Sequence, residues 1–181
     1  MEVTIEKANL DDIEGLVHVY NGDGSQHARE LESYPLTQWL LDDKSHFLVA
    51  KVSRKPIGFI FVRKKGNEVK IDMFSVLKKY KAKGVDKRLL DYIEGMEDAS
   101  KVMTYVPKSD KAMLSLFKKQ EYFTYNEVKN LFGEGENGMY LIKDLAKIQK
   151  QERDKKATKS EKAARSFLEE NLGKLDIYLK P

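Results

Sequence analysis

The sequence predicts an α+β fold in which a central, mostly antiparallel twisted sheet is flanked by helices and followed by a C-terminal helical extension. Three observations support this class. Strand-like segments joined by short turns follow one another between residues 46 and 76, as in an antiparallel meander. Segments with helical spacing come before and after that meander. From Leu145 onward Lys, Glu and Ala dominate, which favours solvated helix.

One strand and two helices are expected before the meander. Residues 3–7 alternate apolar and polar side chains, as a half-buried strand does. Asn9 or Asp11 can cap the helix that follows, and Asn and Gly turn residues end it. Residues 25–42 also show helical spacing, broken near Pro35. The apolar contacts of this second helix are expected from Trp39, Leu40 and Leu41.

The meander and the elements after it complete the predicted sheet. Its three strands are residues 46–52, 57–62 and 68–76. The later elements are a helix at 85–96, a strand at 101–106, a helix at 111–120 and a closing strand pair at 122–125 and 138–142, with an exposed loop at 132–137. Because side chains alternate along a strand, the third strand carries Glu68, Lys70 and Asp72 on one face.

The charge distribution separates residues 1–145, the predicted domain, from residues 146–181, a basic helical extension. The chain carries a formal net charge of +4, and ten basic and six acidic residues after Asp144 account for all of it. A partner attracted by this positive charge would therefore bind at the extension. The acids of the extension alternate with its bases, which argues against nucleic acid. A homo-oligomer formed through the extension is an alternative that the sequence leaves open.

Composition excludes several kinds of site. The chain has no Cys and only three His, which are not spaced as a ligand pair, so no disulfide, thiolate site or metal site is expected. No apolar run resembles a signal segment or reaches membrane-spanning length. These features lead us to expect a cytoplasmic protein.

A basic turn between the third strand and the next helix is the candidate binding site. The strand ends at Val76, and Lys81, Lys83 and Lys87 surround the point where the helix begins. Backbone N–H groups of such a turn, together with the free N–H groups of a helix N-terminus, attract anions. A pyrophosphate group fits this pattern.

The order of the elements across residues 3–145 resembles the GNAT N-acetyltransferase superfamily. That family's pyrophosphate loop has the pattern Gln/Arg-x-x-Gly-x-Gly/Ala, and residues 81–86 stand in its place. Gly84 matches, and Lys81 keeps a positive charge. Asp86 departs from the pattern, because it places an anion where a small residue lets phosphate approach. The sequence is therefore similar to a divergent member of the family.

The resemblance implies that acetyl-CoA is the cosubstrate and that this segment binds it. The expected contacts are Phe74, Val76, Lys81, Ala82, Lys83, Gly84, Val85, Asp86 and Lys87. A second family pattern, Asn-x-x-Ala-x-x-Leu-Tyr-x-Lys-x-Gly-Phe, corresponds to residues 110–122, where Leu116 and Lys119 match. Phe117 replaces the Tyr that commonly acts as general acid, and phenylalanine has no proton to give.

The resemblance also implies direct acyl transfer from the thioester to an amine. The strand that ends at Val76 would then diverge from the strand that starts near Lys101, leaving main-chain groups for pantetheine. A base must take the proton of the amine. Asp72 is the candidate base with Glu68 behind it, since both share a face of the strand, and Tyr105 on the opposing strand is a substitute acid.

Two functions are consistent with these residues. The first is an N-acetyltransferase acting on a small-molecule amine, a lysine side chain or a protein N-terminus. The second is a catalytically weak or inactive GNAT-like domain that binds acyl-CoA or a protein partner. Asp86 and Phe117 favour the second function, whereas Gly84 and the basic turn favour at least cosubstrate binding.

Overall fold

A computed structural model describes residues 2–22, 32–42, 45–81, 83–96 and 98–148, together with residues 156, 158–163 and 166. The chain divides into two compact units, Met1–Asp144 and Leu145–Pro181. The described residues of the second unit are helical, and the rest of the predicted extension lies outside the described residues. Among the described residues, no helix combines the length and apolar character needed to cross a membrane.

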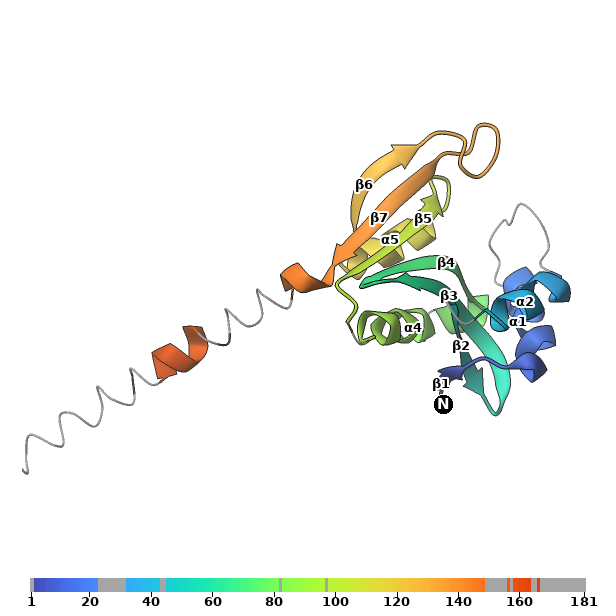
Figure 1. Cartoon of the computed structure of the whole chain (residues 1–181), viewed down its shortest axis with the longest axis horizontal. Coiled ribbons are helices and arrows are strands. Elements are labelled where there is room, and N and C mark those ends of the chain that lie inside the picture. The colour runs from blue at the N-terminus through green and yellow to red at the C-terminus, as the bar shows by residue number, and fades with distance from the viewer. Residues whose placement is uncertain are drawn as a thin grey trace, which may run out of the picture. The chain divides into compact units, whose positions relative to one another are not determined.

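The first unit is built on a mixed sheet whose strand order is β1-β2-β3-β4-β5-β7-β6 (Figure 1). Its strands are β1 (Thr4–Lys7), β2 (Ser45–Val52), β3 (Lys55–Lys65), β4 (Glu68–Val76), β5 (Lys101–Pro107), β6 (Phe123–Val128) and β7 (Gly138–Asp144). The helices are η1 (Leu10–Asp12), α1 (Ile13–Asn21), α2 (Ser33–Leu40), α3 (Lys78–Lys81), α4 (Val85–Glu94) and α5 (Lys111–Lys119). β4 and β5 run parallel, and every other neighbouring pair is antiparallel. The predicted α+β fold, including the meander β2–β3–β4, is confirmed.

Short turns set the register of the meander. Ser53 and Arg54, between β2 and β3, both have positive φ, of 50° and 65°. Two such residues form the tight turn whose twist matches the twist of paired strands. Gly66, with φ of 61°, turns β3 into β4. The positive φ at these positions explains why three strands follow one another with so few connecting residues.

One face of the sheet is covered by α1 and α2. Their buried side chains pack against phenylalanines of β2 and β3, and the main members of this cluster are Leu16, Val19, Leu36, Phe47, Phe59 and Phe61. Trp39 stacks on Phe61 with 5.5 Å between ring centroids, as expected of a contact residue. Leu41 was expected in the same contacts, but its side chain is 64% exposed because α2 ends before it.

Pro35 lies near the start of α2, and Glu32, just before the helix, is extended, so the helical segment is interrupted close to this residue. The helix begins at Ser33, so Pro35 lies in its first turn. A proline is tolerated there, because the first N–H groups of a helix have no partner within it. Residues 23–31, which include most of the earlier part of the predicted helix, lie outside the described residues.

The opposite face of the sheet carries α4. Its buried stripe contains Val85, Leu89, Leu90 and Ile93, each with no exposed surface. β2 alternates between the two faces, so Phe47 and Val49 contact α1 and α2, whereas His46 and Leu48 line a cavity with α4. The segment that connects β4 to α4 begins at the end of β4 and leads to this face of the sheet, and the candidate site lies along it.

Candidate functional site

A fork between β4 and β5 is the central feature of the site. The two strands pair over four residues, and Ile71 and Thr104 are the last pair. Thr104 donates its hydroxyl to the Ile71 carbonyl oxygen at 3.2 Å, which fastens the end of the paired part. Beyond it, the strands continue to Val76 and Pro107 without pairing to each other. The divergence expected from the sequence is confirmed.

A bulge in β4 lies at the same point. The pairing of β4 with β3 shifts register between Phe61 and Val62, and Asp72 is the residue left without a β3 partner. A bulge bends its strand and increases its twist. β4 therefore turns away from β5 at the residue where their pairing stops.

The basic segment after β4 contains one turn of helix and then a glycine. α3, Lys78–Lys81, lies where the sequence predicts a plain turn, and Tyr80 donates its N–H to the Leu77 carbonyl at 2.8 Å. Gly84 has φ of +72°, a conformation that other residues adopt only with strain, and it leads directly into α4. A Cβ at Gly84 would meet nothing within 4 Å, so the space beside this residue is open.

The lysines of this segment differ in their surroundings. Lys81 is half-buried, and Lys83 is exposed with its Nζ 5.3 Å from the Tyr80 ring centroid. Lys87 turns along α4 and donates to both carboxylate oxygens of Asp91, at 2.7 and 2.8 Å. Its charge is therefore shared with Asp91. Ala82, another expected contact, lies outside the described residues.

Asp86 lies at the first turn of α4, where the N–H groups of a helix attract anions. Its Oδ1 accepts the Lys87 N–H at 2.9 Å. Two loop N–H groups also have internal partners, since Lys83 and Gly84 donate to the carbonyls of Tyr80 and Lys81 at 3.0 and 3.3 Å. A pyrophosphate at this position would compete with the Asp86 carboxylate. The segment fits such a group in charge and backbone shape, and Asp86 is the residue that does not fit.

Two of the three candidate catalytic residues meet at the fork. Asp72 and Tyr105 each follow the last pair of β4 and β5. Lys70 connects them, because its Nζ lies 2.9 Å from Asp72 Oδ1 and 5.6 Å from the Tyr105 ring centroid. Glu68 is at the other end of β4, where its carboxylate binds Lys101 at 2.8 Å. Asp72 and Tyr105 are thus brought together, and Glu68 is left apart from them.

Two cations hold the Asp72 carboxylate, since Arg63 also donates to its Oδ2. Burial acts to raise the pKa of Asp72, but the hydrogen bonds and charges of Arg63 and Lys70 outweigh burial, so the pKa lies below its ordinary value. Asp72 therefore stays ionised at neutral pH and accepts a proton only weakly.

Tyr105 begins a row of aromatic rings that crosses β5, β7 and β6. Its ring stacks on Tyr140 with 4.7 Å between centroids, and Tyr125 packs edge-on against Tyr140 at 5.8 Å. Burial and the neighbouring Tyr105 raise the pKa of the Tyr140 hydroxyl, which also contacts Met103 Sδ at 3.1 Å. The row extends the fork into an aromatic surface on the face of the sheet that carries Lys70.

Phe117, in place of the tyrosine common in the resembled family, is part of the core. Its side chain is 1% exposed and packs edge-on against Phe74 and Tyr122, with centroid distances of 6.2 and 4.8 Å. Val76 and Val85 are also buried. Of the expected cosubstrate contacts, these two valines can therefore offer only main-chain groups to a ligand.

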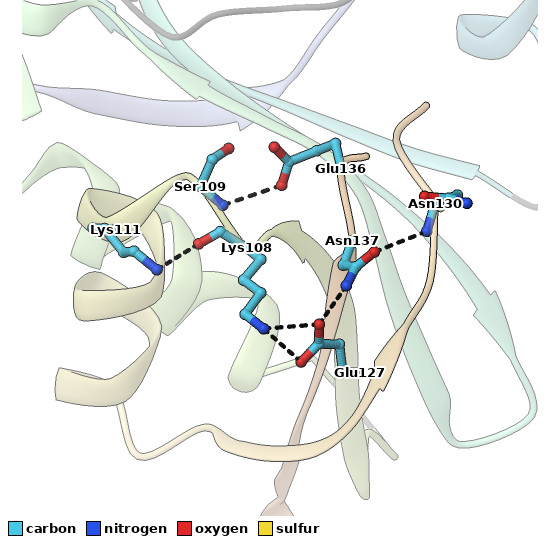
Figure 2. A network of polar contacts seen from close by, with 7 residues as sticks. All are labelled: Lys108, Ser109, Lys111, Glu127, Asn130, Glu136 and Asn137. Carbon is cyan, nitrogen blue, oxygen red and sulfur yellow. Dashed lines mark hydrogen bonds and ion pairs between the residues drawn. The ribbon is translucent and has the colours of Figure 1, made fainter. Parts of the chain in front are cut away.

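The loop between β6 and β7 is tied to the start of α5 by polar contacts (Figure 2). The members are Lys108, Ser109, Lys111, Glu127, Asn130, Glu136 and Asn137. Lys108 Nζ lies 2.9 Å from both carboxylate oxygens of Glu127, and the Asn137 amide donates to Glu127 as well. Because Lys108 follows the last residue of β5, the network holds this loop beside the open end of the fork.

Sequence reasoning missed Lys70 and Tyr140 as site residues. The alternation of β4 placed Lys70 on the same face as Asp72, which was the available signal. Tyr140 carries no such signal, because its place beside Tyr105 depends on the register of β5 with β7. The network of Figure 2 likewise joins residues that are up to 27 positions apart in the chain.

Residues 13–122 match the acetyltransferase (GNAT) family. Solved structures share the fold. The ribosomal-protein-S18-alanine N-acetyltransferase from Escherichia coli has a TM-score of 0.68 at 14% identity, covering 80% of this chain and 95% of that chain. Ard1 from Thermoplasma volcanium has a TM-score of 0.69 at 19% identity, covering 80% and 98%.

The structure of Arabidopsis thaliana NAA60 in complex with a bisubstrate analogue is also similar, with a TM-score of 0.67 at 14% identity, covering 79% of this chain and 98% of that chain. No curated protein matches the sequence. At such identities the likeness to solved structures establishes the fold, and the match over residues 13–122 establishes the family.

Proposed function

Because the chain belongs to the acetyltransferase (GNAT) family, we propose that it transfers an acetyl group from acetyl-CoA directly to an amine. The observation that carries this proposal is the fork, which opens one residue beyond the pair of Ile71 and Thr104. The free part of β4 leads straight to the basic segment and to Gly84. Sites for the thioester and for the pyrophosphate of one extended ligand are thus continuous along the chain.

The proposed cosubstrate site has two parts. Main-chain groups of residues 72–76 would bind the pantetheine arm, since β5 does not pair with this stretch of β4. The segment from Lys81 to Lys87, including Ala82, would bind the pyrophosphate through backbone N–H groups and lysine charge. Asp86 would have to release the Lys87 N–H for full contact.

The proposed transfer balances as a single displacement. The amine nitrogen forms a bond to the acetyl carbon, the carbon–sulfur bond breaks, the amine loses a proton, and the CoA thiolate gains one. Holding amine and thioester together supplies much of the rate. We assign Tyr105 to the thiolate proton and Asp72 to the amine proton, with Glu68 as a more distant alternative. The lowered pKa of Asp72 makes it a weak base, so electrostatic orientation of the amine is its main contribution.

The acceptor is proposed as an amine carried by a small molecule, a lysine side chain or a protein N-terminus. It would approach over the surface formed by Tyr105, Tyr140 and Tyr125, which lies at the mouth of the fork. We also propose a cytoplasmic location and leave open a homo-oligomer formed through the C-terminal unit. The domain division at residue 145 belongs to the same proposal.

A second candidate function is a GNAT-like domain that binds acyl-CoA with little or no turnover. Three observations favour it. The Asp86 carboxylate accepts a hydrogen bond from an N–H group at the helix N-terminus. Phe117 has no acidic proton, and Asp72 is already paired with two cations. An active enzyme needs a proton donor and a proton acceptor that these residues supply only in part.

Release of the CoA thiol in the presence of a panel of amines tests the first function. The panel contains a polyamine, lysine acetylated at its α-amine and short peptides with free N-termini. We expect turnover with one class, and we expect Tyr105→Phe to lower kcat at least about tenfold while Tyr92→Phe, on α4, leaves it unchanged. Binding of acetyl-CoA without turnover on any amine would favour the second function instead.

A further inference from the structure

A cavity of about 640 Å³ lies between the β1–β3 side of the sheet and the C-terminal half of α4. It is on the face of the sheet opposite α1 and α2, because His46 and Leu48 line it and their neighbours Phe47 and Val49 pack against those helices. Its volume falls in the range of small-molecule sites, which is roughly 300–1,000 Å³. None of its lining residues belongs to the fork or to the basic segment, although Asp91 accepts hydrogen bonds from Lys87.

Two lysines and one histidine line the sheet side of this cavity, one from each of three neighbouring strands. Lys7 comes from β1, His46 from β2 and Lys64 from β3. The strands bring them together by register, since Lys7 pairs with Leu48 and His46 lies two residues before Leu48 on the same face. Two lysines and one histidine from three neighbouring strands therefore share one concave surface.

Burial and two neighbouring lysines both lower the pKa of His46. Burial has the largest effect on this pKa, and the charges of Lys7 and Lys64 lower it further. The helix side contributes the carboxylate of Asp91 and the hydroxyl of Tyr92. The Asp91 carboxylate accepts two hydrogen bonds from Lys87. Asp91 is thus paired with Lys87, and Lys7 and Lys64 bring positive charge to the opposite, sheet side of the cavity.

The remaining walls are apolar. Leu48 is buried at the base, and Tyr92 and Met96 of the α4 side give an aromatic ring and a flexible thioether. The Tyr92 side chain is 50% exposed, so this wall of the cavity is accessible from solvent. A ligand suited to this cavity has an anionic head and an apolar body.

We propose that this cavity binds a small organic anion, with its carboxylate or phosphate head at Lys7, His46 and Lys64 and its apolar body against Leu48, Tyr92 and Met96. The proposal does not depend on acetyl transfer. By linkage, an anion that favours the imidazolium form of His46 binds more tightly as pH falls through the titration of that group. Each unit by which the ligand raises the pKa corresponds to tenfold tighter binding to the protonated form.

The test follows the imidazole resonances of His46 by NMR as pH is varied, using the full chain with saturating hexanoate, phenyl phosphate or inorganic phosphate. Hexanol is the uncharged control. We expect hexanoate or phenyl phosphate to raise the pKa of His46 by about one unit, with His18 on α1 unaffected. If hexanoate is the stronger ligand, the cavity prefers a carboxylate head group. If phenyl phosphate is the stronger ligand, the cavity prefers a phosphate head group. An effect of inorganic phosphate equal to that of phenyl phosphate would overturn the role of the apolar wall.

Variants separate binding at this cavity from a general salt effect. Lys7→Met should reduce the ligand-induced pKa shift of His46, and Tyr92→Ala should weaken hexanoate binding about tenfold. Lys55→Met, a matched change at an exposed position of β3, should do neither. An unchanged His46 titration with all three anions, or equal responses in Lys7→Met and Lys55→Met, would refute the proposal.

Discussion

At the residue scale, the ion pairs of Asp72 affect both the stability of the fold and the basicity of this carboxylate. Its carboxylate lies between Arg63 and Lys70, and their hydrogen bonds hold its pKa below the unfolded value of 3.8 despite the opposing effect of burial. A carboxylate with a lowered pKa stabilises the folded state above its unfolded pKa. That stability is lost as pH falls through the folded pKa.

Asp72→Asn should therefore lower the melting temperature at pH 7 by a few degrees, corresponding to a loss on the order of 1–2 kcal/mol for a half-buried ion pair. The difference from wild type should shrink as the pH falls from about 4 through the lowered folded pKa of Asp72, because the wild-type carboxylate is then protonated and both proteins lack the charge. Thermal unfolding followed by circular dichroism across this range measures it. Glu14→Gln, an exposed change on α1, is the control, and a pH-independent difference would contradict the ion-pair account.

Asp86 is the residue that most separates this chain from the family pattern. Because its carboxylate accepts the Lys87 N–H, replacing it should free that donor and remove a negative charge beside the proposed pyrophosphate site. Asp86→Gly is expected to tighten acetyl-CoA binding about tenfold by calorimetry, as the loss of a close like charge predicts. Asp98→Asn, which removes a carboxylate after the other end of α4, should leave affinity unchanged. Weaker binding by Asp86→Gly would mean that Asp86 supports the loop.

At the scale of elements, the β6–β7 hairpin depends on the polar network of Figure 2. Asn137 is its centre, because its side chain donates to Glu127 and accepts the Asn130 N–H at 3.1 Å. Lys108, together with Asn137, lowers the pKa of Glu127, which keeps this carboxylate ionised at neutral pH. The loop therefore stays beside the end of β5.

Asn137→Ala should loosen the loop without unfolding the sheet. The amide of Asn130 loses its acceptor, so its hydrogen exchange should speed up about fivefold, the equivalent of about 1 kcal/mol. Amides of β5 should keep their protection, because β5 pairs with β4 and β7. Exchange measured by NMR checks this, with Asn126→Ala on β6 as the matched control. Equal exchange of Asn130 in both variants would show that the network does not hold the loop.

The elements themselves could largely be predicted from the sequence, because apolar alternation and helical spacing are local patterns. The strands of the meander and the stripe of α4 carry such patterns clearly. The bulge at Asp72 could not be predicted, since it exists only in the pairing of β4 with β3. Pro35 is a local signal with two meanings, because a proline is typical both of a break in a helix and of its first turn.

At the scale of the whole molecule, the fork depends on the combined geometry of the two halves of the sheet. β1–β4 are antiparallel and curve at the bulge, whereas β5 joins them through a short parallel pairing. The basic segment could be predicted from the residues themselves, and the divergence was expected only from the resemblance to the GNAT family. The cluster at the fork could not be predicted in full, since Arg63, Lys70, Asp72 and Tyr105 come together only through strand register.

Binding of acetyl-CoA to the full chain, measured by calorimetry, tests the central claim most directly. Gly84→Trp places a large side chain in the open space beside the basic segment, and Gly66→Trp makes the same change at another positive-φ glycine, in the turn between β3 and β4. We predict that wild type and Gly66→Trp bind with the same affinity and that Gly84→Trp loses binding at least about tenfold. Failure of the wild type to bind at millimolar acetyl-CoA, or equal binding by all three proteins, would contradict the assignment of the fork and the basic segment as the acetyl-CoA site.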